Sequence, residues 1–281
     1  MTLEKIISEL HFTDNIEQAV LSNLCKKENS IAQIAENAYC GENFAFNLCS
    51  HGALTRLTVT VYLLKQKYND YASLNIPDYV IFETFRDVSL RAALYYKVTG
   101  ETGISKDDVI WFRHIMNNAI FKIDSLQFQP FEMLYLDEET IGEPYMLFSK
   151  TQKETLPGGT PVLNCHIQHG ADLTPQAVKM SFQNAKRFFA KYFPSVSFKA
   201  FLCYSWLLYP PMLKHLPETS KIKQFADHFT VIGTCSDSDQ AIENILGTGK
   251  IKALPANATR LQKLAVSHSE DFGFACGIIT I

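Results

Sequence analysis

The sequence contains no CxxC pair, no long apolar run and no excess of positive charge. Its seven cysteines are irregularly spaced, so neither a structural zinc site nor a redox motif is expected, and no metal is predicted. Lys and Arg total 26 against 29 Asp and Glu, whereas nucleic-acid-binding proteins usually carry a basic excess. No window reaches the length of a membrane span, and the first residues lack the basic and apolar regions of a secretion signal. We therefore expect a reduced, cytoplasmic protein without a nucleic-acid or membrane partner.

What the sequence does contain is a large apolar fraction with two different periodicities. Hydrophobic residues make up 47% of the 281 residues, which is enough for one large domain or two ordinary ones. Apolar positions recur at helical intervals before Asn118, apart from a predicted loop over residues 41–51, and the period then changes to that of strands. We therefore predict an α+β protein, with a helical N-terminal domain over residues 1–125 and a second domain over residues 126–281.

The second domain is predicted to hold a mixed, mostly antiparallel sheet flanked by helices. Residues 120–128 and 131–136 are strand-like, with a turn or bulge at Gln129-Pro130, and residues 143–148 are a further strand candidate. Later in the chain, the pattern predicts a strand over residues 198–208, a helix at 220–226, a strand over 229–235, helices over 238–246 and 255–267, and a strand over 272–281.

The segment from Pro161 to Gly233 alternates between strand-like and helix-like patterns without a break. An apolar run ends in His-Ile-Gln-His-Gly, an amphipathic helix opens on Thr174-Pro175, and a second apolar run ends in Cys-Tyr-Ser-Trp. This order predicts one central β-α-β crossover within the sheet. Because α/β proteins usually bind ligands at the carboxyl ends of such strands, the polar residues there are the candidate site.

Three motifs, together with the order of elements, resemble a bacterial group of GNAT-like acyltransferases that carry a helical N-terminal domain. The motifs are NCHIQHG (164–170), YSWLL (204–208) and LPETSKIKQF (216–225). The resemblance implies an N-acyltransferase that moves an acyl group from acyl-CoA directly to a small amine-bearing acceptor. It also implies that two central strands splay apart, that acyl-CoA occupies the gap, and that its pyrophosphate meets N–H groups at the start of the crossover helix.

The loop after the first of these strands would then bind the acyl-CoA. It is formed by Ile167, Gln168, His169, Gly170 and Ala171.

This loop departs from the GNAT pattern, because it has one glycine where the family has a glycine-rich turn. Asp172 adds a negative charge where a phosphate would bind. A second hypothesis therefore stays open, in which the protein is a non-catalytic GNAT-like module that binds a ligand or another protein. An empty anion-sized cradle at Gly170 would favour the enzyme, and a cradle filled by Asp172 would favour the binding module.

Acyl transfer to an amine requires a base, stabilisation of an oxyanion and protonation of the leaving thiolate. His166 is the candidate base because imidazole titrates near neutral pH, although a buried strand histidine bonded to a carbonyl is the alternative. Tyr204 and Ser205 are the candidates for protonating the thiolate. A nucleophilic Cys203 with His166 as its base is a further alternative, whereas Cys165 cannot pair with His166 because adjacent strand residues point to opposite faces.

Overall fold

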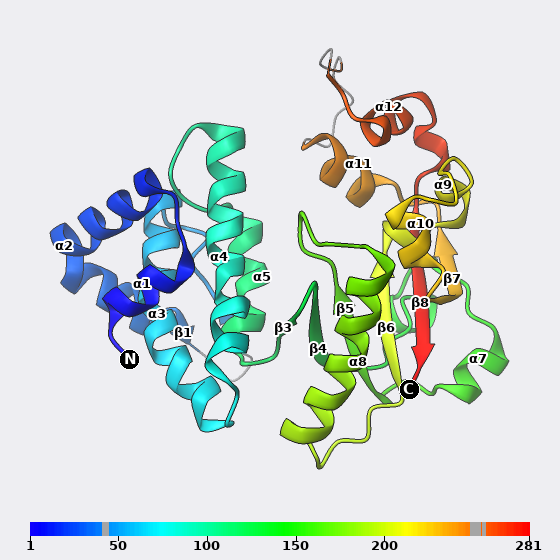
Figure 1. The fold of residues 1–281 in the computed structure, drawn as a ribbon, viewed down its shortest axis with the longest axis horizontal. Coiled ribbons are helices and arrows are strands. Elements are labelled where there is room, and N and C mark those ends of the chain that lie inside the picture. Colours follow the sequence, from blue (N-terminus) through cyan, green and yellow to red (C-terminus); the bar gives the residue numbers. More distant parts are fainter. Residues whose placement is uncertain (41–44, 248–253, 255–256) are drawn as a thin grey trace. The chain divides into compact units, whose positions relative to one another are not determined.

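The computed structural model describes residues 1–40, 45–247, 254 and 257–281 (Figure 1). The chain divides into two compact units, Met1–Ile123 and Asp124–Ile281. The sequence places the domain boundary close by, between residues 125 and 126. None of the helices in the described part of the chain has the length and apolar character needed to cross a membrane.

The first unit is mainly helical, as its sequence pattern predicts. The hydroxyl of Thr2 accepts a hydrogen bond from the Lys5 N–H and caps the first helix, and Ser105 and Asp108 form a capping box at the last. Its elements are α1 (Leu3–Leu10), α2 (Asp14–Asn37), β1 (Tyr39–Cys40), β2 (Ala45–Phe46), α3 (Ala53–Ser73), α4 (Asp78–Thr99), α5 (Lys106–Met116) and β3 (Phe121–Ile123). α2 is kinked at Lys27, where the backbone is non-helical.

The predicted loop over residues 41–51 is wrong in part. Ala45–Phe46 forms the short strand β2, which pairs antiparallel with β1, while residues 41–44 lie outside the described chain. The pairing of Tyr39 with Phe46 supplies backbone hydrogen bonds that the apolar periodicity of so short a segment does not reveal.

The second unit combines a sheet with helices. Its elements are β4 (Leu126–Glu132), α6 (Glu138–Ile141), α7 (Lys150–Thr155), β5 (Pro161–His166), α8 (Pro175–Tyr192), β6 (Ala200–Ser205), the 3-10 helix η1 (Trp206–Leu208), α9 (Pro210–Leu213), α10 (Lys221–Ala226), β7 (Thr230–Cys235), α11 (Asp239–Leu246), α12 (Arg260–Ser267), the 3-10 helix η2 (Ser269–Asp271) and β8 (Phe274–Thr280). The start of the predicted helix over residues 255–267 lies outside the described residues, and α12 begins at Arg260.

The strands of the larger sheet follow the order β3-β4-β5-β6-β8-β7. β5 and β6 are parallel and are joined by the crossover helix α8, whereas β4 with β5, β6 with β8 and β7 with β8 are antiparallel (Figure 1). This arrangement confirms the predicted α+β class, with one β-α-β crossover in a mostly antiparallel sheet.

Three strand predictions in this unit need correction. The strand predicted over residues 120–128 is interrupted, because the chain turns at Asp124, whose φ is 54°. The turn or bulge predicted at Gln129-Pro130 does not form, because both residues lie inside β4 and pair with Asn164 and Leu163. Proline is tolerated there because only alternate residues donate to a given neighbouring strand. The strand predicted over residues 198–208 is β6, which ends at Ser205. It ends there because the Ser205 hydroxyl accepts a hydrogen bond from the Leu207 N–H and begins η1.

The predicted strand over residues 143–148 does not form. Met146 and Phe148 instead pack on the sheet, in an apolar cluster with Val162 and Leu202. In β7, a Cβ at Gly233 would approach the Phe148 ring to 2.5 Å, so only glycine leaves space for that ring. The apolar residues that suggest a strand are therefore those of a connection that covers the sheet.

The sheet of the second unit is covered on both faces. On one face, α8 packs through Phe182, whose ring centroid is 5.7 Å from that of Phe128 and 4.8 Å from that of Phe201. On the other face, the connection between β4 and β5 contributes Met133, Tyr135, Met146 and Leu156, which form an apolar cluster with residues of the strands. Because both faces are buried, the strands are nearly continuous apolar runs, and polar residues within them are informative.

Candidate active site

The two parallel strands separate before they end. β5 and β6 are paired at Leu163 with Phe201 and at Asn164 with Leu202, and the described chain records no further β5–β6 pair. On their outer sides, β5 stays paired with β4 as far as His166, and β6 stays paired with β8 as far as Ser205. The sheet therefore opens between β5 and β6 at their carboxyl ends, as the resemblance implies.

Polar side chains lie beside this opening on one face of the sheet. His166 is opposite Gln127 in the β4–β5 ladder, and Asn164 is opposite Gln129, so all four share that face. Gln127 is 1% exposed, Gln129 8% and Asn164 9%. His166 Nε2 is 2.9 Å from Gln129 Oε1. Amides so deeply buried among apolar strands are costly unless they have polar partners.

One of these amides has an unsatisfied oxygen. The Oδ1 atom of Asn164 is buried and has no hydrogen-bond partner in the structure. Asn164 also occupies the last paired position before β5 and β6 separate. Since a buried acceptor without a partner costs about 1–3 kcal/mol, the position suits a bound donor such as an amide N–H or a water.

Tyr204 lies on the same face as His166, because Asn164 is paired with Leu202 and residues two apart in a strand share a face. Its hydroxyl donates a hydrogen bond to the Leu134 carbonyl at 2.5 Å. Burial raises the pKa of Tyr204 well above its usual value. The residue is therefore a protonated hydroxyl, held against the connection that covers this face.

The other candidates point toward α8. Ser205 is buried, and its hydroxyl caps η1. Cys203 contacts Cys165, and this hydrogen bond together with burial raises the pKa of the Cys203 thiol. A protonated thiol on the face opposite His166 cannot use that histidine as its base, so the alternative of a nucleophilic Cys203 is wrong.

The loop that follows β5 leads into the N-terminus of α8. Gly170 has a φ of +76° and nothing within 4 Å of where its Cβ would be. The Ala171 N–H donates to the Gln168 carbonyl at 3.1 Å, and His169 is exposed. Ile167 is partly buried at the carboxyl end of β5. The five residues predicted to bind acyl-CoA thus form one short turn beside the strand opening.

Asp172 occupies part of the start of α8. Its carboxylate accepts from the Thr174 N–H and from the Thr174 hydroxyl, both at 3.0 Å, and pairs with Lys221 Nζ at 3.4 Å. The hydrogen bonds from Thr174 lower the pKa of Asp172. The N–H groups of Gln176 and Ala177 lie in the first turn of α8 and therefore have no intrahelical acceptor. Because Thr174 makes no side-chain cap, they can meet an anion.

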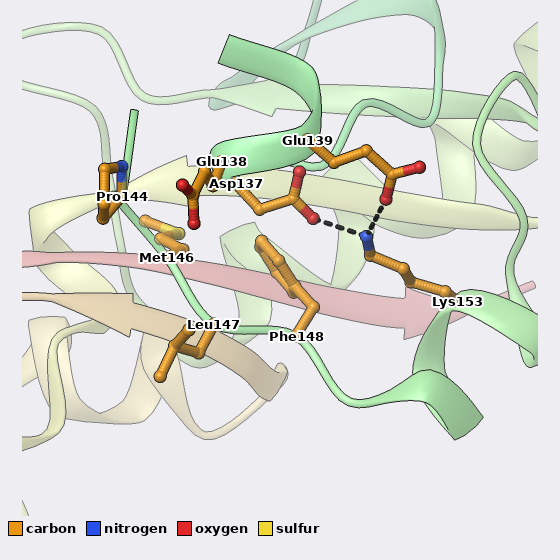
Figure 2. A pocket seen from close by; sticks show the side chains of 8 residues that line it. All are labelled: Asp137, Glu138, Glu139, Pro144, Met146, Leu147, Phe148 and Lys153. Carbon is orange, nitrogen blue, oxygen red and sulfur yellow. Dashed lines mark hydrogen bonds and ion pairs between the residues drawn. The ribbon is translucent and has the colours of Figure 1, made fainter. Parts of the chain in front are cut away.

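A pocket of about 440 Å³ is formed by the same connection that carries Leu134 (Figure 2). Lys153 Nζ bridges Asp137 Oδ2 at 2.6 Å and Glu139 Oε2 at 2.9 Å. Burial opposes ionisation of Asp137, but hydrogen bonds from Lys153 and Thr140 hold its pKa below the usual value. Figure 2 shows Glu138 on the acidic side and Met146, Leu147 and Phe148 on the apolar side.

Two family profiles match the chain along nearly its whole length. The profile described as the N-acyltransferase N-terminal domain matches residues 1–117, and the GNAT-like C-terminal domain matches residues 120–279. The chain belongs to the GNAT-like N-acyltransferases. The predicted family, fold class and assignment as an acyltransferase are thereby confirmed.

Solved acyltransferases share the fold of this acyltransferase. One is a structure in complex with decanoyl-CoA and teicoplanin, with a TM-score of 0.75 and 17% identity over 99% of this chain and 87% of that chain. Another is in complex with decanoyl-CoA, with a TM-score of 0.72, 19% identity and the same coverage. No curated protein matches this sequence.

Sequence reasoning missed the buried amides Gln127, Gln129 and Asn164 of this acyltransferase. The signal was present, because each interrupts an apolar strand. The register that places the three on the face of His166 comes only from the β4–β5 pairing.

Proposed function

We propose that this acyltransferase moves an acyl group from acyl-CoA to an amine in one direct step. The observation that carries the proposal is the early end of the β5–β6 pairing at Asn164 and Leu202. The opening beyond it suits the pantetheine arm, and backbone N–H groups at the strand ends are donors for the thioester carbonyl. The amine nitrogen forms the new C–N bond, and the C–S bond breaks to release the CoA thiolate.

His166 is the proposed base in this reaction. The contact with Gln129 assigns its tautomer: where Gln129 Oε1 accepts, Nε2 carries the hydrogen and Nδ1 carries the lone pair. A histidine oriented in this way by a buried amide can take the proton that the attacking amine loses. Gln129 is therefore a positioning residue for His166.

Tyr204 is the proposed acid for the leaving thiolate. It shares the face of His166, and its hydroxyl carries a proton that it donates to the Leu134 carbonyl. Ser205 is less suited to this role because it lies on the α8 face and its hydroxyl caps η1.

We further propose that the CoA pyrophosphate binds at the turn from Ile167 to Ala171 and the start of α8. The N–H groups of Gln176 and Ala177 and the ammonium of Lys221 would be its donors. Asp172 now holds Lys221 and the Thr174 N–H. The binding-module hypothesis expects Asp172 to occupy the donors at this position. Membership of an acyltransferase family favours the enzyme.

A small amine is the proposed acceptor. The acidic pocket in Figure 2 supports a cationic substrate, because Asp137, Glu138 and Glu139 outnumber its one lysine, Lys153. Its apolar side, with Leu147 91% exposed, suits an amine that also carries an apolar group. Solved relatives bind teicoplanin and decanoyl-CoA, so larger acceptors and medium-chain donors belong in the same test.

The donor is tested by calorimetry with acetyl-CoA and decanoyl-CoA, followed by mass spectrometry of reactions with a panel of amines and with teicoplanin. We expect saturable binding of an acyl-CoA and an N-acylated product with release of free CoA. Binding without any product across the panel would favour the binding module. No heat from either donor would refute the acyl-CoA proposal.

Replacement of Asp172 tests the pyrophosphate site. The Asp172→Asn variant keeps an oxygen for the Thr174 N–H and removes the negative charge, so we expect a several-fold lower KM for acyl-CoA. The control donor is an acyl-pantetheine, which has no pyrophosphate and whose KM should not change. Equal effects on both donors, or a higher KM for acyl-CoA alone, would contradict the assignment.

A further inference from the structure

Two histidines and a carboxylate come together outside the site described above. His215 follows α9, His268 follows α12, and Asp271 ends η2. Their ligand atoms all lie within 4.8 Å of one another. His215 Nε2 is 2.7 Å from Asp271 Oδ2, and His268 Nδ1 is 4.0 Å from the same oxygen. We propose that this cluster binds a divalent transition metal, with zinc as the best-fitting ion.

The chemistry of the three ligands supports zinc. Two imidazole nitrogens and a carboxylate oxygen are a common zinc donor set, with bonds of about 2.0–2.2 Å and ligand atoms about 3.3 Å apart in tetrahedral geometry. The distances of 2.7 and 4.0 Å to Asp271 Oδ2 bracket that spacing, so side-chain shifts of about 1 Å would complete the coordination. Glu270, whose Oε1 is 3.9 Å from His268 Nδ1, is the available fourth ligand.

The backbone holds the three residues in place. The N–H of His215 donates to Met212, that of His268 to Leu264, and that of Asp271 to His268, at 2.9–3.1 Å. The segments also pack on one apolar cluster, which includes Met212, Leu216, Ala265 and Phe272. A site whose backbone is fixed by folding loses less entropy when the metal binds.

The arrangement of the rings and charges also favours a cation. The two imidazoles are stacked, with centroids 4.7 Å apart and planes inclined by 29°, and the Asp271 carboxylate lies beside both rings. The side chains of His215, His268 and Asp271 are 29%, 45% and 35% exposed, which leaves the ion a route from solvent. A bound zinc ion would join the α9, α12 and η2 segments.

The sequence prediction of no metal depended on cysteine spacing. His215 and Asp271 are 56 residues apart, so no spacing motif could reveal this cluster.

The test is zinc titration of the untagged full-length protein after EDTA treatment and buffer exchange, by calorimetry and by the visible spectrum of the cobalt-substituted form. We expect one equivalent of zinc with a Kd at or below about 1 µM, a higher Tm with zinc, and a four-coordinate cobalt spectrum. His268→Ala and Asp271→Asn should each raise the Kd at least about tenfold. The matched control is His228→Ala, at an exposed histidine outside the cluster, which should leave the Kd unchanged.

The Glu270→Gln variant tests whether Glu270 is the fourth ligand. We expect its Kd for zinc to rise less than in the His268 and Asp271 variants if a water molecule replaces the carboxylate. Circular dichroism identifies any variant that fails to fold. If a ligand variant does not fold, zinc binding by the unmodified protein and by the His228→Ala control decides whether the site exists. Absence of saturable binding at about 100 µM zinc, or equal Kd values in the control and ligand variants, would show that His215 and Asp271 form an ion pair only.

Discussion

Replacement of His166 by glutamine is expected to lower kcat/KM for acyl transfer about 10²–10⁴-fold, with little change in the binding of acyl-CoA. That range is the usual contribution of a positioned general base. Glutamine preserves a side chain that can meet Gln129, which lies 2.9 Å from the ring, but it cannot accept a proton. The effect should therefore fall on the chemical step.

The pH–rate profile separates a base from a structural histidine. If His166 is the base, the loss of activity toward acidic pH disappears in the His166→Gln variant, and activity rises with amine deprotonation alone. Gln129→Glu, which strengthens the contact to a protonated ring, should shift the acidic limb without abolishing turnover. His228→Gln is the control. A variant of His166 with unchanged kcat and an unchanged profile would refute the assignment.

Replacement of Phe182 by alanine is expected to reduce the free energy of unfolding by about 3–5 kcal/mol. Phe182 joins the crossover helix to the sheet, with its ring against those of Phe128, Phe201 and Phe229. Removing it leaves a cavity between α8 and the sheet that the surrounding aromatic rings can fill only in part. The loss of these contacts also loosens the helix start at which the pyrophosphate is proposed to bind.

Equilibrium urea unfolding measures this effect, with the midpoint and the slope fitted separately. The control in the same helix is Tyr192→Ala, at the partly exposed last residue of α8, which should cost much less. A loss below about 1 kcal/mol for Phe182→Ala would show that α8 is not anchored through this ring.

The sequence predicted most of the elements that form through local interactions. The caps at Thr2 and Ser105 and the first turn of α8 at Pro175 are specified by neighbouring residues. Apolar runs also located β5, β7 and β8 correctly within a few residues. By contrast, the strand predicted over residues 143–148 was wrong, because an apolar segment can cover a sheet as well as join it.

The candidate site shows the same division. Family motifs led to His166, Tyr204 and the turn at Gly170. Only the strand register showed that Tyr204 shares the face of His166 and that Ser205 lies on the opposite face. The roles of Gln129 beside His166 and of the unsatisfied Asn164 depend on β4 pairing with β5.

By itself, the sequence determined the helical and α/β regions, the crossover between two parallel strands, and the resemblance to acyltransferases, because periodicity, caps and motifs are local properties. Only the tertiary structure decided where β5 and β6 separate, which polar side chains share a face, and that His215, His268 and Asp271 meet. These features depend on pairing and packing between residues far apart in the chain, and a one-residue change of register would reverse the face of each strand residue.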